Sequence, residues 1–183
     1  MDGPLNPAPR RARVERQTKE TKVVVELELD GSGVATINTG IGFFNHMLIL
    51  FATHGRFDLT IRAQGDLEVD THHTVEDVGI CLGMSLKESL GNRSGIKRYG
   101  SSVVPMDEAR AAVYIDLSNR PYLVYDTVSL APRIGQFETE TLPEFFRAFC
   151  THGGVTLHIE ALKGSNTHHI IEATFKALGR ALR

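Results

Sequence analysis

An internal repeat is the feature of this 183-residue sequence that most constrains its fold. The segment Thr71–Glu76 (THHTVE) matches Thr167–Glu172 (THHIIE) at an offset of 167 − 71 = 96 positions. Upstream, Thr53–Gly55 matches Thr151–Gly153, both reading Thr-His-Gly, at an offset of 151 − 53 = 98. Two matched blocks in the same order indicate a duplicated unit, and the difference between the offsets indicates a change in the length of one loop.

The hydrophobic pattern predicts the same order of elements in both halves: strand, strand, helix, strand, helix. Alternating apolar residues favour the strands, and apolar residues three and four positions apart favour the helices. The predicted fold class is α+β, with two half-domains at about residues 10–94 and 95–183, each a small sheet packed on two helices. Residues 1–9 hold three prolines and are expected to form a disordered leader. The predicted strands are Thr21–Asp30, Val34–Asn38, Phe57–Ile61, Ala111–Leu117, Tyr122–Val128 and Val155–Ala161, and the predicted helices are Ile41–His54, His73–Leu90, Leu142–Cys150 and His169–Leu182.

Charge and apolar content exclude several classes of protein. Twenty basic and 22 acidic residues leave a formal charge of −2, which gives no reason to expect nucleic acid or an anionic membrane as a partner. No apolar stretch approaches the ~18 residues of a membrane span, and the N-terminus lacks the apolar segment of a secretory signal. Cys81 and Cys150 lie in apolar segments of predicted helices and do not form a C-x-x-C motif. We therefore expect two reduced, packed thiols and a cytoplasmic protein.

The repeated His-His-x-x-Glu motif carries the chemistry. Glu76 lies three residues after His73 and four after His72, so it shares a helix face with both histidines. Neighbouring residues diverge by about 100° around a helix, so one histidine can join the glutamate while the other faces a different centre. Imidazole and carboxylate without thiolate suit Mn²⁺, Fe²⁺, Co²⁺ or Zn²⁺. A solvated polar helix is the alternative, but two copies at matched positions favour two metal sites.

The repeat also points to further ligands. His46 corresponds to Glu144 at the offset of 98, and each lies eight residues before the histidine of a Thr-His-Gly. Both are ligand types, although either could instead be a surface side chain. His54 and His152 also correspond, but each ends a predicted helix, where a cationic histidine is favoured in any case.

A series of motifs resembles the imidazoleglycerol-phosphate dehydratase family. The resemblance covers residues 10–183 and implies a single dehydratase domain made of the two repeats, with a fold like that of ribosomal S5 domain 2. The motifs, in order, are Arg16–Thr21, Thr39–Leu48, His54–Leu59, Asp70–Asp77, Gly95–Gly100, Pro105–Glu108, Asp116–Pro121 and His168–Ala177.

The resemblance implies a dehydratase of histidine biosynthesis, which converts imidazole glycerol phosphate to imidazole acetol phosphate with two Mn²⁺ ions, or other divalent transition metals, per active site. It also implies active sites between subunits and trimers assembled into a 24-subunit particle. The implied metal ligands are His46, His72, His73, Glu76, Glu144, His168, His169 and Glu172. The implied substrate-binding residues are Glu20, His46, His54, His72, Arg98, Asp107, Arg120 and Lys176.

The reaction explains this combination of residues. The proton to be removed lies on a carbinol carbon, and no neighbouring carbonyl group makes that proton acidic. Metal ions bound to the imidazole ring would help the ring to expel the neighbouring hydroxyl group. A carboxylate must take the proton, and the candidates are Glu172 first, Glu20 second and Glu76. Arg98 and Arg120 offer forked donors to phosphate, and Lys176 adds a point charge.

The sequence departs from the family pattern at a few positions. Asn45 stands where the family usually has Asp, Asn119 where it usually has Gly, and Glu144 where many relatives have His. The Ser-Thr-Lys-Gly-type tail that helps to hold phosphate in the family does not follow Arg183. Two other classes remain open: a dinuclear metallohydrolase that cleaves a phosphate ester, and a metal-storing or structural metal protein.

Overall fold

The computed structural model describes residues 9–183, which form two four-stranded sheets and four helices. The predicted leader, residues 1–9, lies outside the described residues except for Pro9. The first sheet has the order β1-β2-β4-β3 and the second the order β5-β6-β10-β7. The strands are β1 Arg11–Gln17, β2 Thr21–Glu28, β3 Ala35–Asn38, β4 Asp58–Gly65, β5 Tyr99–Met106, β6 Ala109–Asp116, β7 Tyr122–Thr127 and β10 Thr156–Lys163, with the short pair β8 Arg133–Ile134 and β9 Phe137–Glu138.

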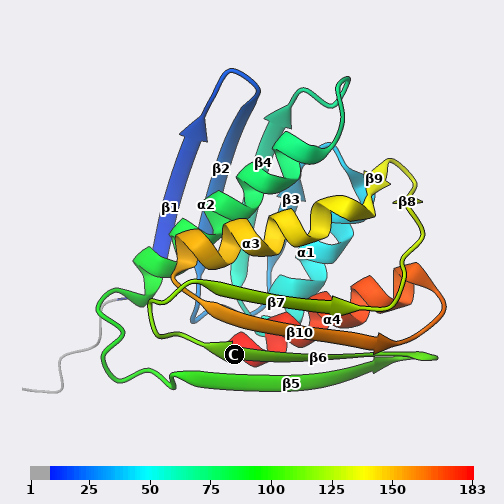
Figure 1. Cartoon of the computed structure of the whole chain (residues 1–183). Coiled ribbons are helices and arrows are strands. Elements are labelled where there is room, and N and C mark those ends of the chain that lie inside the picture. Colours follow the sequence, from blue (N-terminus) through cyan, green and yellow to red (C-terminus); the bar gives the residue numbers. More distant parts are fainter. Residues whose placement is uncertain (1–8) are drawn as a thin grey trace, which may run out of the picture.

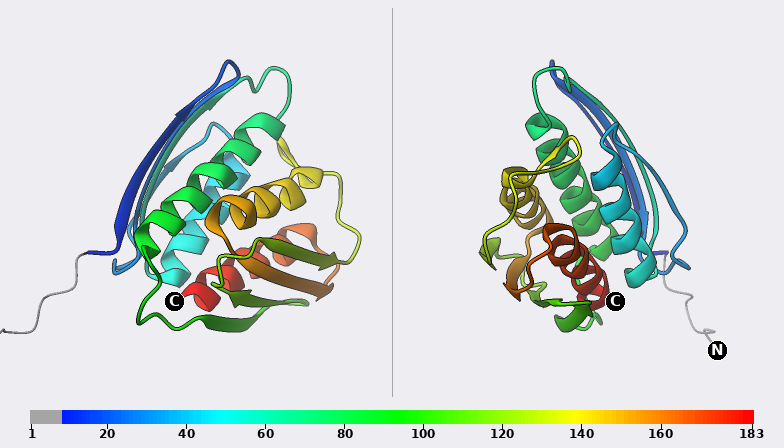
Figure 2. Two further views of the ribbon diagram at one scale, coloured as in Figure 1. Left: turned by 60° about the vertical axis from the view of Figure 1, so that its left-hand side comes forward. Right: turned by 90° about the vertical axis from the view of Figure 1, so that its right-hand side faces the viewer.

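The helices lie between the two sheets (Figures 1 and 2). They are α1 Gly42–Gly55, α2 His72–Leu90, α3 Leu142–Gly153 and α4 Thr167–Leu182, and a 3-10 turn, Thr139–Thr141, precedes α3. Helix α2 packs on β1 and β2, and α4 packs on β5 and β6. Among residues 9–183, none of the helices combines the length and apolar character needed to cross a membrane.

The two sheets confirm the duplication. In each, the first three strands run antiparallel, and the fourth strand in the order pairs parallel with its neighbour (β3 with β4, β7 with β10). Strands β2 and β6 even share one burial pattern, in which alternate residues are buried. Val23, Val25 and Leu27 of β2 face the helices, as do Val113 and Ile115 of β6. A sheet with one covered face produces this alternation.

The predicted order of elements lacks the first strand of each half. The four-stranded sheet of each half draws three strands, not two, from the segment before its first helix, and the second half adds the short pair β8 and β9. The pattern did not predict β1 and β5 because they are edge strands with weak hydrophobic alternation. In β1 (RARVERQ) only Val14 is buried, and β5 (YGSSVVPM) holds Gly, Ser and Pro, which are unusual in strands. Both strands are held chiefly by their backbone pairing to β2 and β6, which the pattern of side chains does not reveal.

The main hydrophobic core lies in the helical layer and draws on both halves. Cys81 and Cys150 are buried in this core, as expected of packed reduced thiols, and burial raises the pKa of both to about 12. The largest fully buried side chains of the core are the phenylalanines Phe44, Phe137, Phe145, Phe146, Phe149 and Phe175.

Helices from opposite halves cross at matched glycines. A Cβ on Gly83 of α2 would lie 2.6 Å from the Phe149 carbonyl oxygen of α3 and 2.9 Å from the Gly153 nitrogen. A Cβ on Gly179 of α4 would similarly meet the Phe51 oxygen and lie 2.9 Å from the Gly55 nitrogen of α1. Gly83 and Gly179 are 96 positions apart, whereas the residues that they contact on α3 and α1 are 98 positions apart. Each crossing therefore joins a helix from the block repeated at 96 to a helix from the block repeated at 98.

We therefore expect Gly179→Ala to destabilise the protein by about 1–3 kcal/mol, the usual effect of overpacking, because the methyl group meets the backbone of α1. The free energy of unfolding in urea measures the loss. Gly42→Ala is the control, since no atom lies within 4 Å of its added Cβ, and it should leave stability unchanged or slightly raised. Equal stability of the two variants would contradict close contact between α1 and α4.

Candidate functional site

Three predicted ligands converge where α1 lies beside α4. His46 projects from α1, and His168 and Glu172 project from the first turns of α4, with ligand atoms that all lie within 4.8 Å of one another. The Glu172 Oε2 atom lies 3.1 Å from the Nε2 atom of His168 and 3.5 Å from the Nε2 atom of His46. We call these three residues the His/Glu triad. No other group of three His, Cys, Asp or Glu residues within 9–183 is as close.

The local sequence places the triad. His168 and Glu172 are four residues apart and share one face of α4, and the Asn166 side chain accepts a hydrogen bond from the His168 backbone N–H at 2.9 Å to cap the helix. The rings of Phe43 from α1 and His168 form a T-shaped pair, with centroids 5.1 Å apart. The helix start and the aromatic contact together fix the position of the His168 ring.

Glu172 is the most enclosed member of the triad and has a cationic partner. Its side chain is 9% exposed, and its Oε1 atom lies 2.6 Å from the Lys176 Nζ atom. Burial opposes its ionisation, but the hydrogen bond and charge of Lys176, with His168 and His46, outweigh burial and lower the pKa of Glu172. The carboxylate is therefore ionised at neutral pH. Two imidazole nitrogens and a carboxylate oxygen also fit a divalent transition metal.

The corresponding residues of the other motif are less closely grouped. His72 and Glu76 share a face of α2, with 3.9 Å between the Nε2 and Oε2 atoms. Glu144, the counterpart of His46, forms an ion pair with Arg147 on its own helix. Within one chain, the structure thus brings together all three residues of the first group but only two of their three counterparts.

The adjacent histidines of each motif diverge as expected. The rings of His72 and His73 lie 6.2 Å apart at 82°, and those of His168 and His169 lie 6.2 Å apart at 76°. The second histidine of each pair meets a carboxylate. The Nδ1 atom of His73 lies 3.0 Å from Asp66, and the Nδ1 atom of His169 lies 2.8 Å from Glu108.

These two carboxylates change the ionisation of their partners. The hydrogen bond from His169, followed by those from the Asn166 and Ser165 backbone, lowers the pKa of Glu108 to about 2, and Glu108 in turn raises the pKa of His169. The hydrogen bond with Asp66 raises the pKa of His73 in the same way. Sequence reasoning missed both acids, because each lies in a loop outside the repeated motif.

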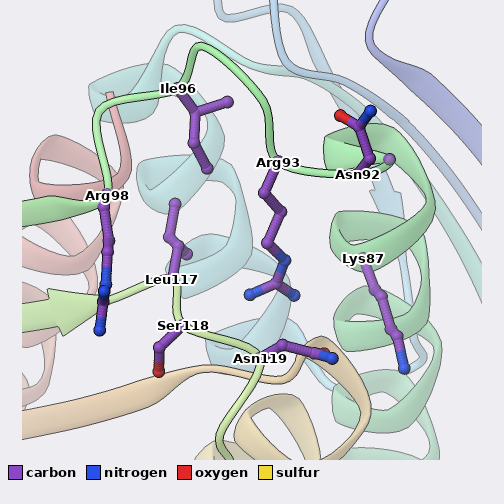
Figure 3. A pocket seen from close by; sticks show the side chains of 9 residues that line it. Lys87, Asn92, Arg93, Ile96, Arg98, Leu117, Ser118 and Asn119 are labelled. Carbon is purple, nitrogen blue, oxygen red and sulfur yellow. The ribbon is translucent and has the colours of Figure 1, made fainter.

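The predicted phosphate-binding arginines meet on one carboxylate. The Nε and Nη2 atoms of Arg98 lie 2.6 and 3.1 Å from the two oxygens of Asp116, and Arg120 lies 3.5 Å from the same side chain. Arg98 also lines a cavity of about 440 Å³ in which Lys87 and Arg93 extend alongside it (Figure 3). This region is strongly cationic.

The arginines and the triad lie at opposite ends of α4. Gly100, two residues after Arg98, contacts the backbone of Ala181 in the last turn of α4, whereas Glu172 lies near its start. Nine residues of helix separate Glu172 from Ala181, a rise of about 14 Å. In Figure 1 the beginning of β5 accordingly lies far from the beginning of α4.

The remaining predicted substrate residues are spread over two helices and two turns. Lys176 contacts Glu172 directly, and burial with the charges of Lys176 and Arg180 lowers the pKa of His54 on the neighbouring helix. Asp107 lies in the β5–β6 turn, with its Oδ2 atom 3.8 Å from the His169 Nε2 atom. Glu20 lies in the β1–β2 turn, where its N–H donates to the Thr18 hydroxyl at 3.1 Å.

The two asparagines that depart from the family pattern have defined roles. Asn119 adopts the left-handed conformation, with φ of 62°, which asparagine tolerates better than most residues and which keeps the turn before Arg120. The Asn45 side-chain oxygen accepts hydrogen bonds from the N–H and hydroxyl of Thr39, at 2.9 and 2.6 Å. It therefore anchors the start of α1, the helix that carries His46.

Comparison with known proteins gives one consistent result. The sequence model of the imidazoleglycerol-phosphate dehydratase family matches residues 39–182. The chain is 63% identical to the imidazoleglycerol-phosphate dehydratase of Syntrophobacter fumaroxidans and 58% identical to that of Acetivibrio thermocellus, over 94% of this chain and 88% and 89% of those proteins.

Two solved structures are similar. Imidazoleglycerol-phosphate dehydratase from Staphylococcus aureus has a TM-score of 0.83 and 42% identity, covering 94% of this chain and 95% of that one. The enzyme from Pyrococcus furiosus in complex with (S)-C348 has a TM-score of 0.80 and 38% identity, covering 92% and 90%.

Proposed function

Since the chain belongs to the imidazoleglycerol-phosphate dehydratase family, a family of hydro-lyases, we propose that it is a metal-dependent dehydratase that converts imidazole glycerol phosphate to imidazole acetol phosphate in histidine biosynthesis. The observation that carries the proposal is the His/Glu triad with Lys176 bound to its glutamate. This arrangement joins ligands for a metal ion to an ionised carboxylate that can accept a proton.

The proposed cofactor is two Mn²⁺ ions per active site, with other divalent transition metals as substitutes. One ion would be held by His46, His168 and Glu172, whose nitrogen and oxygen donors suit such a metal. The other would be held by the counterparts His72, Glu76 and Glu144, and His73 and His169 would complete the two sites from neighbouring copies. When bound, such ions act as Lewis acids that stabilise a deprotonated imidazole ring.

The residues around Glu172 would carry the proton transfer. The hydroxyl on the adjacent carbon would leave as water with a proton released by the imidazole ring, and the Glu172 carboxylate would take the proton from the carbinol carbon. Return of that proton from Glu172 to the ring completes the enol, which becomes the ketone. Lys176 keeps Glu172 ionised before the reaction. Glu20, on the turn that follows β1, is the second candidate for the base, and Glu76 the third.

The remaining proposed contacts bind and orient the substrate. Arg98 and Arg120 would hold the phosphate through forked hydrogen bonds, for which Asp116 already aligns both guanidinium groups. Lys176 would add a positive charge, and His54, Asp107, His46 and His72 would line the route to the ring. Because the arginines lie at one end of α4 and the triad at the other, we infer that the complete site combines residues from different copies.

We also propose that the chain assembles into trimers and a 24-subunit particle in the cytoplasm. The outer face of the second sheet exposes Tyr99, Val103, Tyr114 and Tyr122, which are large apolar side chains of the kind that subunit contacts cover. The net charge of −2 supports neither nucleic acid nor membrane as a partner.

Incubation of the Mn²⁺-loaded protein with imidazole glycerol phosphate tests this function. We expect the enolisable ketone to form and the phosphate ester to stay intact, because the arginines would bind the phosphate far from the base. Protein stripped of metal with EDTA is the control and should be inactive until Mn²⁺ is restored. Release of inorganic phosphate without ketone would instead identify a metallohydrolase, and the absence of both products would refute the proposal.

A further inference from the structure

In both His-His-x-x-Glu motifs, the Nδ1 atom of the second histidine lies within hydrogen-bond distance of a carboxylate. The Nδ1 atom of His73 lies 3.0 and 3.2 Å from the two oxygens of Asp66, and the Nδ1 atom of His169 lies 2.8 Å from Glu108. The first histidine of the α4 motif is turned the other way, since the Nε2 atom of His168 faces Glu172 at 3.1 Å. The two kinds of histidine are therefore oriented by different carboxylates.

A carboxylate beside Nδ1 determines which nitrogen of a neutral histidine can bind a metal. An ionised carboxylate only accepts hydrogen bonds, so Nδ1 must carry the proton, and the lone pair is left on Nε2. Partners of this kind fix the tautomer and the ring orientation of metal-binding histidines in many proteins.

The two acids come from unrelated places in the repeat. Asp66 lies in the loop between β4 and α2, whereas Glu108 lies in the turn between β5 and β6. At the offset of 96, the position that corresponds to Asp66 is Leu162. Duplication therefore did not copy one acid into both halves, yet each half places a carboxylate at the same ring atom of the same histidine. Such a match indicates a shared requirement.

Glu108 is itself held in place by the backbone. Its Oε1 atom accepts hydrogen bonds from the N–H groups of Ser165 and Asn166, at 3.1 and 2.7 Å, while its Oε2 atom faces His169. These two residues directly precede α4, which carries His169. The carboxylate thus connects the β5–β6 turn to the helix start and is fixed relative to the ring that it contacts.

We propose that Asp66 and Glu108 are positioning residues, which hold His73 and His169 with Nδ1 protonated and thereby leave Nε2 as the metal ligand. In His169 this Nε2 atom lies 3.8 Å from the Oδ2 atom of Asp107. The proposal rests on the metal-dependent function proposed above. Each acid acts through the histidine that it orients, so its loss weakens metal binding rather than removing a ligand.

Metal retention by the Mn²⁺-loaded full chain, measured during titration with a chelator, tests the proposal. Asp66→Ala and Glu108→Ala are each expected to weaken Mn²⁺ retention about 10–100-fold, the usual effect of removing such a partner. Asp66→Asn and Glu108→Gln should recover most of the loss, because the amide oxygen still accepts a hydrogen bond from Nδ1–H. Glu68→Ala is the control, since Glu68 is an exposed acid two residues from Asp66.

Nitrogen NMR of the histidine rings in the metal-free chain gives a second measurement that does not depend on activity. The wild-type spectrum should show Nδ1-protonated His73 and His169, and each alanine variant should shift its own histidine towards a mixture of tautomers. Retention within twofold of wild type in both alanine variants would overturn the proposal, as would equal losses in the amide and alanine variants. If the wild type itself retains no Mn²⁺, the proposed metal dependence fails instead.

Discussion

Glu172→Gln is expected to lower turnover by at least ~10²-fold, the usual scale for a positioned acid or base, while part of the bound metal remains. Glutamine keeps the length and shape of glutamate but supplies a neutral amide, which cannot accept the carbon-bound proton. His46 and His168 remain as the other two proposed metal ligands. Steady-state rates and metal content, measured on the same samples, separate the loss of the base from the loss of a ligand.

Glu76→Gln is the matched control, because the repeat gives Glu76 the corresponding position on α2. The two glutamates differ in their surroundings. The side chain of Glu172 is 9% exposed and contacts Lys176, whereas that of Glu76 is 43% exposed, and the position corresponding to Lys176 is Ile80. We therefore expect a smaller loss in Glu76→Gln, with rescue by added Mn²⁺. Equal losses in both variants, both rescued by metal, would remove Glu172 as the base.

The repeat predicted the duplicated architecture because segments with similar sequences fold into similar structures. The matched Thr-His-Gly and His-His-x-x-Glu blocks located two helices in each half, and the structure places α1 and α3, and α2 and α4, at those positions. The pairing of helices across the halves was not predictable in this way. It depends on Gly83 and Gly179, whose role appears only when two backbones approach each other.

The site was predictable to the extent that its ligands lie on repeated helices. His46, His168 and Glu172 were each inferred from residue type and position, and they meet in the structure. Asp66 and Glu108 were not inferred, because a carboxylate in a loop gives no periodic signal and its partner is 7 or 61 residues away. Contacts of this kind are set by the tertiary structure.

The two halves differ at positions around the candidate site. Glu144 stands in place of a histidine and pairs with Arg147, and Lys176 has an apolar counterpart. A symmetric duplication would provide two equal sites, whereas these substitutions give Glu172 a cation that Glu76 lacks. The repeat therefore places candidate metal ligands in both halves, but it places a lysine beside the motif glutamate only in the second half.

Co-assembly of two inactive variants should restore activity if the active site is shared between copies. Glu172→Gln removes the proposed base and Arg98→Ala removes a proposed phosphate contact. In one chain, Glu172 lies near the start of α4 and Arg98 lies beside its end. In a particle mixed from equal amounts, each site would draw its base from one copy and its arginine from another. About a quarter of the sites would then hold both wild-type residues, so activity should rise from near zero to about a quarter of wild type.

A second pair of variants distinguishes shared sites from nonspecific recovery. Glu172 and Lys176 contact each other within one chain at 2.6 Å, so a particle mixed from Glu172→Gln and Lys176→Ala can form no intact pair and should stay inactive. Arg120→Ala can replace Arg98→Ala, since both arginines meet Asp116, and should give the same recovery. If the Arg98 mixture also stays inactive, the arginine and the base of each site come from the same chain, and the prediction of shared sites is wrong. The length of α4 between the two residues argues against such a site within one chain.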